Sequence, residues 1–309
     1  MELRTLIHDA RVIDLRGQVA IVTGAGKGIG REIARALAAR GASVVVNNRA
    51  RDGVDSAGDL VAEINKAGGV AVAERSSVEA PEASDLLVAA AIENYGRLDL
   101  VVANAAIVDR ATFGKAEPKR FREVMEIDFM APVELARAAL PEVRKHSGRF
   151  LFITSAAGTY GEYGVSSYAA AKGALSAFAK TLAIEGRRDG VKANLLAPFA
   201  LTQMTEGFVP HEQTKVMSPA MVVAAAMWLL NPDTDVTGQT IVAAGNRFRA
   251  VVTGETAGLV FPVEQSVGDD RFADAAAALF ELDGWESYPD GMAAFLGLMA
   301  MDTESGGMA

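Results

Sequence analysis

Short apolar runs alternate with longer amphipathic segments along most of this chain. Residues 19–22 are apolar and lead into a glycine-rich turn, which is typical of a buried strand. Residues 28–39 place Ile29, Ile33 and Leu37 at helical spacing, and Gly41 follows them. The same alternation predicts strands at residues 43–47, 70–74, 98–103, 150–154, 191–196 and 239–243, and helices at residues 57–66, 83–95, 119–144, 166–186 and 217–230.

The turn after the first predicted strand reads Thr23-Gly24-Ala25-Gly26-Lys27-Gly28-Ile29-Gly30. Glycine permits a tight turn, a close approach of the backbone to a pyrophosphate, and close packing of helix on strand. The helix that follows adds free N–H groups and the positive end of its dipole. Because this turn opens the first strand–helix–strand unit, we expect it to bind a nucleotide rather than to be an ordinary connection.

Apolar strands separated by helices indicate a parallel sheet with helices on both faces. We therefore predict an α/β fold with a Rossmann-like, doubly wound parallel sheet of about seven strands, plus a C-terminal extension. Residues 1–16 are expected to form a leader, residues 17–245 the catalytic and coenzyme-binding domain, and residues 246–309 a partly helical extension. Because the alternation stops after Gly245, the extension is expected to pack on the domain or on a partner subunit.

Composition narrows the class of partner. With 309 residues, of which 50% are hydrophobic, the chain has the profile of a globular enzyme. Its net charge of −9 argues against nucleic acid or an anionic membrane, and no run approaches the roughly 20 apolar residues of a spanning helix. The lack of cysteine excludes a thiol nucleophile, and the three histidines show no metal-ligand spacing. We expect a cytoplasmic protein without a metal that acts on a small molecule.

A serine, a tyrosine and a lysine form the candidate proton-transfer group. Ser155 follows the strand predicted at residues 150–154, and Tyr168 lies four residues before Lys172 in a predicted helix. Residues at that spacing share a helix face. The ammonium can then favour the phenolate and lower a tyrosine pKa that is otherwise about 10. Taken alone, this spacing is also consistent with a solvated pair, so its meaning depends on the glycine turn upstream.

The end of the second predicted strand bears on which coenzyme binds. An acidic residue there would accept hydrogen bonds from the ribose 2′-hydroxyl and repel a 2′-phosphate. This chain has Asn48 and Arg49 instead, with no carboxylate before Asp52. Arg49, and Lys27 of the glycine turn, are cations that can pair with a phosphate. We predict NADP(H), with NAD(H) as the alternative if both cations are only solvated surface groups.

Jointly, these motifs resemble those of the short-chain dehydrogenase/reductase family over residues 17–245. The turn matches T-G-x-x-x-G-x-G, the N-A-G element after the fourth strand appears as Asn104-Ala105-Ala106, and Tyr168 and Lys172 match Y-x-x-x-K. The family has one Rossmann-like domain that contains the catalytic residues, so the resemblance implies a nicotinamide-dependent oxidoreductase. It implies coenzyme contacts from Thr23, Gly24, Lys27, Gly28, Ile29, Gly30, Asn48, Arg49, Val78, Asn104, Ala105, Ala106, Tyr168, Lys172, Pro198 and Thr202.

The resemblance also implies a role for each member of the catalytic group. Tyr168 would be the general acid/base, Lys172 would lower its pKa and hydrogen-bond the nicotinamide ribose, and Ser155 would orient the carbonyl or alcohol. The family often has an asparagine as a fourth catalytic residue. The matching position here is Asp128. The resemblance implies that the main-chain carbonyl of this residue holds a relay water, in which case an aspartate suffices. The alternative is that its charge opposes phenolate formation and raises the working pH.

A narrower similarity runs to the (3R)-hydroxyacyl-CoA dehydrogenase units of multifunctional β-oxidation enzymes, although those units usually carry an acidic residue at the position of Asn48. We expect hydride transfer to or from an apolar ketone or secondary alcohol, such as a 3-oxoacyl or 3-hydroxyacyl thioester or a steroid. The alternative is a coenzyme-binding protein with impaired catalysis, because Ala106 and Phe199 replace family glycines. The resemblance implies a homodimer or homotetramer. Candidates for the pocket wall are Tyr160, Tyr163, Met204, Phe208 and Met217.

Overall fold

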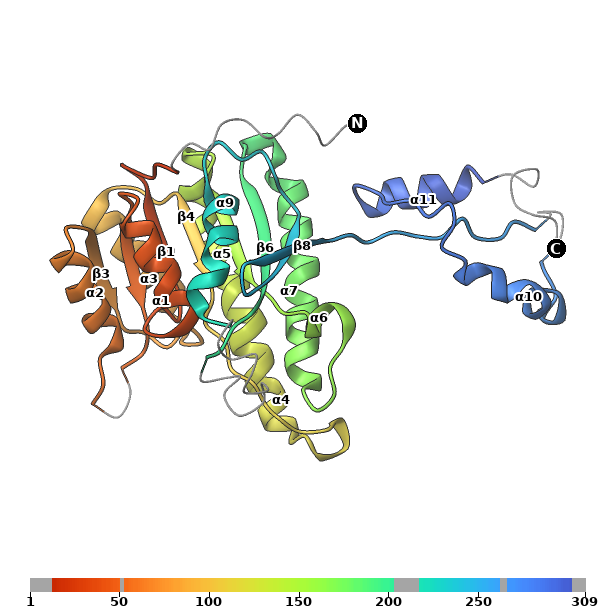
Figure 1. Cartoon of the computed structure of the whole chain (residues 1–309), viewed down its shortest axis with the longest axis horizontal. Coiled ribbons are helices and arrows are strands. Elements are labelled where there is room, and N and C mark those ends of the chain that lie inside the picture. Colours follow the sequence, from red (N-terminus) through yellow and green to blue (C-terminus); the bar gives the residue numbers. More distant parts are fainter. Residues whose placement is uncertain (1–12, 51–52, 203–216, 262–265, 302–309) are drawn as a thin grey trace. The chain divides into compact units, whose positions relative to one another are not determined.

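The computed structural model describes residues 13–50, 53–202, 217–261 and 266–301 (Figure 1). One sheet contains the strands β1 (Val19–Val22), β2 (Ser43–Asn47), β3 (Val70–Glu74), β4 (Leu100–Ala103), β5 (Arg149–Ile153), β6 (Lys192–Phe199), β7 (Thr240–Ala244) and β8 (Arg247–Val251). Their order across the sheet is β3-β2-β1-β4-β5-β6-β7-β8, and β1 to β7 run parallel. The order reverses between β1 and β4, and doubly wound sheets bind ligands at the carboxyl ends of such strands. The predicted fold class is confirmed.

Helices cover both faces of this sheet. One face packs against α1 (Gly28–Ala38), α2 (Ser56–Lys66) and α9 (Val223–Leu230), and the other against α3 (Ala83–Tyr95), α5 (Ala131–Lys145) and α7 (Ser166–Glu185). Successive residues of β1 therefore enter different cores, and all four are buried. This two-sided burial is the reason why the strands read as continuous apolar runs. In the described part of the chain, no helix is both long and apolar enough to cross a membrane.

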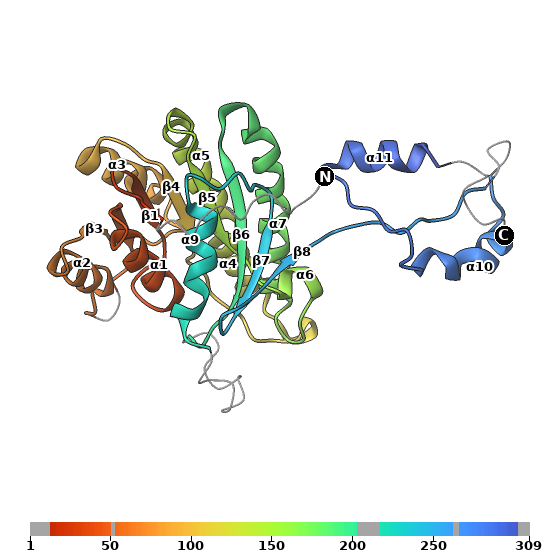
Figure 2. The same cartoon turned by 45° about the horizontal axis from the view of Figure 1, so that its top comes forward.

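The sheet has one strand more than the sequence predicted. Gly245 and Asn246 join β7 to β8 with φ angles of 50° and 61°. A two-residue turn with both φ angles positive matches the twist of an antiparallel hairpin. Figure 2 shows β8 beside β7 at the edge of the sheet. The sequence pattern did not predict β8 because Arg247 and Arg249 interrupt its apolar residues, and the strand is exposed along most of its length.

The chain divides into two compact units, residues 1–250 and 251–309, so the hairpin strand β8 extends the first unit beyond Gly245. The described part of the second unit contains α10 (Asp269–Ala275), the 3-10 turn η6 (Ala276–Phe280) and α11 (Gly291–Met299), which confirms the C-terminal extension. Residues 251–309 include eleven carboxylates and a single basic residue, Arg271. The negative net charge of the protein therefore belongs to this extension rather than to residues 1–250.

Three phenylalanines fill the core between β5 and α7, and they allow a test of the packing. The rings of Phe150 and Phe152 stack with centroids 6.1 Å apart, and Phe152 meets Phe178 edge to face at 5.7 Å. Phe152→Ala removes a side chain that is 1% exposed, so we expect the free energy of unfolding to fall by about 3–5 kcal/mol in urea. The control is Phe113→Ala, at a residue 78% exposed, where the loss should stay below about 0.5 kcal/mol. Equal losses in the two variants would contradict this packing.

Candidate functional site

A cleft of about 790 Å³ opens at the carboxyl ends of the strands near the point of reversal. The glycine turn and the end of β2 line it on one side, and residues of α7 line it further along. The predicted site residues in its lining are Gly24, Lys27, Gly28, Ile29, Asn48, Arg49, Val78, Asn104, Ala105, Ala106, Tyr168, Lys172, Pro198 and Thr202. The other four, Thr23, Gly30, Asp128 and Ser155, contact or adjoin residues of that lining.

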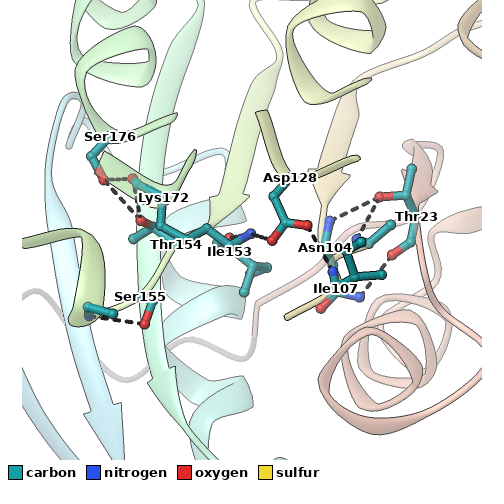
Figure 3. A network of polar contacts seen from close by, with 11 residues as sticks. Thr23, Asn104, Ile107, Asp128, Ile153, Thr154, Ser155, Lys172 and Ser176 are labelled. Carbon is teal, nitrogen blue, oxygen red and sulfur yellow. Dashed lines mark hydrogen bonds and ion pairs between the residues drawn. The ribbon is translucent and has the colours of Figure 1, made fainter. Parts of the chain in front are cut away.

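Hydrogen bonds join the glycine turn after β1 to the end of β4. Thr23 Oγ1 accepts bonds from the N–H groups of Asn104 at 3.0 Å and Ala105 at 3.1 Å. In return, Asn104 Nδ2 donates to the carbonyls of Thr23 at 2.9 Å and Gly24 at 3.1 Å (Figure 3). Gly24 has a φ of +61°, and a Cβ there would lie 2.8 Å from Ala105 Cα. Only glycine therefore allows the turn to approach β4 this closely.

The end of β2 presents amide and guanidinium groups to the cleft. Asn48 Nδ2 donates to Ser56 Oγ at 2.8 Å. The Arg49 guanidinium lies 3.5 Å from Glu79 Oε1 and 3.5 Å from Ser77 Oγ. An ion pair of this length between partly exposed side chains is weak. A bound phosphate group can therefore replace Glu79 as the partner of Arg49.

The helix α7 places Tyr168 and Lys172 on one face, as their spacing predicts. Lys172 Nζ lies 5.5 Å from the centre of the Tyr168 ring and donates to the Ile153 carbonyl at 3.1 Å. The backbone carbonyl of Lys172 accepts bonds from Thr154 Oγ1 at 3.0 Å and Ser176 Oγ at 2.8 Å (Figure 3). Lys172 is thus fixed to the end of β5 through both its side chain and its backbone.

Ser155 lies between β5 and the short helix α6 (Ala157–Tyr160), and its Oγ accepts a bond from the Ala157 N–H at 3.1 Å. The position of this turn depends on Gly158. A Cβ there would lie 2.6 Å from the Lys172 carbonyl carbon and 2.7 Å from Gly173 N. The lack of a side chain lets α6 rest on the backbone of α7, so the turn that carries Ser155 lies beside Lys172.

The prediction of one continuous helix at residues 119–144 is wrong in one respect, because the structure interrupts that helix with a turn. A π turn, η3 (Glu126–Met130), separates α4 (Pro118–Met125) from α5, and Asp128 is its central residue. Pro132 accounts for the interruption, since it lacks the N–H group that would bond to the carbonyl of residue 128 in an α-helix. Such π turns often occur at functional sites.

Asp128 is fully buried at the centre of this turn. Its Oδ1 accepts a bond from the Ile107 N–H at 2.8 Å, and its Oδ2 lies 3.2 Å from Lys172 Nζ. Burial raises the pKa of Asp128 above the ordinary value of 3.8, although the charge of Lys172 and the Ile107 N–H oppose that rise. The aspartate therefore touches the candidate catalytic lysine and does not line the cleft itself.

Several neighbours of the site were not predicted. Ile107 contacts Asp128 through its backbone N–H, which leaves no signal in the sequence, whereas Thr154 is the last residue of a predicted strand and Ser56 precedes a predicted helix. Among the candidates for the pocket wall, Tyr160 and Tyr163 are 74% and 90% exposed and Met217 is buried, and none of these three lines the cleft. The other two, Met204 and Phe208, lie outside the described residues.

Comparison with known proteins places this arrangement in context. The sequence pattern of the short chain dehydrogenase family matches residues 18–213. A peroxisomal multifunctional enzyme type 2 of Mus musculus is 37% identical over 229 residues, which make up 72% of this chain but only 31% of that enzyme. A 3-oxoacyl-[acyl-carrier-protein] reductase of Vibrio cholerae is 30% identical over 248 residues, 76% of this chain and 99% of the reductase. A solved 7α-hydroxysteroid dehydrogenase, complexed with NADH and 7-oxo glycochenodeoxycholic acid, aligns at a TM-score of 0.70 and 31% identity over 75% of this chain and 95% of its own.

The raised pKa of Asp128 predicts a pH-dependent stability. A carboxyl group that holds its proton more tightly in the folded state stabilises that state at low pH, and the contribution is lost as pH rises from 3.8 through the raised pKa. Asp128→Asn removes this titration. In urea unfolding at a series of pH values, we expect the stability of the wild type to fall relative to that of Asp128→Asn as pH increases. A difference in stability between wild type and Asp128→Asn that does not depend on pH would contradict a raised pKa for Asp128.

Proposed function

Since the chain belongs to the short-chain dehydrogenase family, we propose that it transfers a hydride between NADP(H) and an apolar ketone or secondary alcohol, with Tyr168 as the general acid/base. The observation that carries the proposal is the cleft, whose lining includes both the glycine turn and the Tyr168–Lys172 face of α7. A coenzyme bound along this cleft would extend from a phosphate-binding turn to a proton donor. That is the arrangement that reversible carbonyl reduction requires.

The residues along the cleft fit a dinucleotide. The turn approaches the end of β2 so closely that a Cβ on Gly26 would lie 2.8 Å from Asn48 Cγ. The first N–H groups of α1, which begins at Gly28, would bind a pyrophosphate. Lys27 adds a positive charge on that side of the cleft. Asn48 and Arg49 would hold the adenosine ribose and its 2′-phosphate, and Lys172 would hold the nicotinamide ribose. The coenzyme, when bound, supplies the hydride chemistry.

The proton is handled by side chains of the chain itself. For ketone reduction, Tyr168 would give its phenolic proton to the carbonyl oxygen, and for alcohol oxidation the phenolate would accept it. The Oγ of Ser155 is fixed by the bond that it accepts from the Ala157 N–H, so its own proton can be donated to the same substrate oxygen. The tyrosine would thus transfer the proton while the serine orients the carbonyl.

An apolar substrate is supported by apolar residues in the lining of the cleft, among them Ile107, Ile153, Leu201 and Pro219. The names of the relatives point to 3-oxoacyl thioesters and to steroids, and we propose this range of ketones for the present chain. A coenzyme-binding protein with impaired catalysis would show no turnover on any member of such a panel.

The location and assembly of the protein stay predictions. We expect a cytoplasmic homodimer or homotetramer from the sequence. The mouse relative is named as peroxisomal, so cell fractionation is needed to decide between the two compartments. The mass of the particle in solution, measured by light scattering, would test the oligomer.

Tyr168→Phe tests the acid/base directly. The variant keeps the aromatic ring but has no proton to transfer, so we expect turnover to fall by about 10²–10⁴-fold while the coenzyme dissociation constant stays nearly unchanged. Initial rates of NADPH oxidation and a fluorescence titration of the coenzyme measure the two quantities. Tyr160→Phe makes the same change at an exposed tyrosine and serves as the matched control. Full turnover in Tyr168→Phe would remove the proposed mechanism.

The ratio of kcat/KM for NADPH to that for NADH tests the choice of coenzyme. Arg49→Leu removes a cation at the proposed 2′-phosphate position and should lower the ratio about tenfold, which corresponds to about 1.4 kcal/mol. Glu79→Gln removes the carboxylate that competes for Arg49 and should raise the ratio. A wild-type preference for NADH, or a change in the same direction in both variants, would contradict the assignment.

A further inference from the structure

A pair of opposite charges lies beside Tyr168 and is almost completely buried. The side chains of Asp128 and Lys172 are 0% and 3% exposed, and Oδ2 lies 3.2 Å from Nζ. Figure 3 shows the carboxylate reaching the lysine. Within the described residues, Oδ2 has no hydrogen bond, so Lys172 Nζ is its one close polar contact. The negative charge of Asp128 therefore acts mainly on this ammonium.

Both members of the pair are also held at their other atoms. Asp128 Oδ1 accepts the Ile107 N–H at 2.8 Å, and Lys172 Nζ donates to the Ile153 carbonyl at 3.1 Å. Neither side chain can turn away without leaving a buried polar group unpaired. The distance between the two charges is thus set by the fold, and their combined field at Tyr168 is a fixed property of the site.

Other charges near α7 are poorly placed to offset this pair. Lys27, Arg49 and Glu79 line the cleft at the end formed by the glycine turn and β2. Arg149 and Lys192 begin β5 and β6, at the opposite edge of the sheet. Other titratable groups lie on α7 or on the segments packed against it. Asp109 is half-buried, and the rest have exposed side chains, namely Arg110, Lys119, Arg120, Arg122, Glu123, Glu126, Tyr160, Glu162, Tyr163, Lys180, Glu185, Arg187, Arg188 and Asp189.

We propose that Asp128 is a positioning residue that offsets the charge of Lys172 and thereby keeps Tyr168 in its proton-donating form, which suits the site to ketone reduction. This inference rests on the proposed function, because it assigns a preferred direction to the same acid/base group. A carboxylate beside the ammonium makes the pair neutral overall, so the pair stabilises a nearby phenolate less than a lone lysine does. An asparagine would have the same shape and keep the bond from the Ile107 N–H, but it would leave the lysine charge unopposed.

The effect grows toward alkaline pH. Burial raises the pKa of Asp128 above the ordinary value of 3.8. Below that pKa the pair carries the single positive charge of Lys172, and above it the pair is neutral. The protonated tyrosine therefore persists to higher pH than it would with an asparagine at position 128.

Ultraviolet absorbance of the phenolate in the coenzyme-free protein tests this without turnover. The difference between each protein and its Tyr168→Phe counterpart isolates one of the five tyrosines. Asp128→Asn should move the midpoint of phenolate formation to lower pH by about one unit. Asp99→Asn also removes a buried carboxylate, one that pairs with Arg97 just before β4, and should leave the midpoint unchanged. An unchanged or higher midpoint in Asp128→Asn would overturn the proposal.

A double variant keeps the test decisive if Asp128→Asn does not fold. Asp128→Asn with Lys172→Met removes both charges together and so leaves no uncompensated buried charge. If Asp128 offsets Lys172, the double variant and the wild type should form the phenolate within about half a pH unit of each other. A large shift to higher pH in the double variant would show that the ammonium acts unopposed in the wild type, which contradicts the proposal.

Rates in both directions connect the titration with catalysis. The pH–rate profiles are measured with a ketone for reduction and with the corresponding alcohol for oxidation. In Asp128→Asn, the alkaline limb of the reduction profile and the acidic limb of the oxidation profile should both move to lower pH by about one unit. If the variant is active but both limbs of its pH–rate profiles stay at the wild-type pH, the proposal is contradicted. If the wild type reduces no carbonyl compound, the proposed function fails, whereas the absorbance comparison still decides the role of Asp128.

Discussion

The reversal of strand order between β1 and β4 is the constraint on which the rest of the site depends. Both strands run parallel and end at the same edge, and the bonds between Thr23 and Asn104 hold those ends together. The loops after β2 and β5 emerge at the same edge and bring in Asn48 and Ser155, and the end of β6 brings in Pro198. Residues spread along the chain thus meet around one cleft, because parallel strands deliver every loop of this kind to one side.

The second constraint is the cost of placing charge in the interior. Lys172 and Asp128 are both buried, and an unpaired charge in the interior is costly. Their pairing links the helix α7, the π turn and the loop after β4 into one unit. We propose that Arg49 favours the phosphorylated coenzyme and that Asp128 favours the protonated tyrosine, and both proposed features suit a reductase.

Local pattern was sufficient to predict most of the sheet, and the family resemblance supplied many of the residues that line the cleft. The strands β1, β2 and β3 occupy the predicted residues. The apolar runs of β1 and β2 are buried on both faces, whereas β3 is a partly exposed edge strand with a short apolar run. The tyrosine–lysine spacing needed only helix geometry. The strand β8 was missed because Arg247 and Arg249 interrupt its apolar residues, and the π turn because Pro132 lies within an otherwise continuous helical pattern. The contact between Asp128 and Lys172 depends on packing between separate helices, which no local pattern encodes.

The central claim is that one cleft aligns a nicotinamide coenzyme with Tyr168 and Lys172. A crystal structure of the protein with NADP(H) tests it most directly. The account predicts the pyrophosphate at the glycine turn, the 2′-phosphate within hydrogen-bond distance of Arg49, and the nicotinamide ribose within hydrogen-bond distance of Lys172 Nζ. A coenzyme bound outside this cleft, or bound with its nicotinamide turned away from Tyr168, would contradict it.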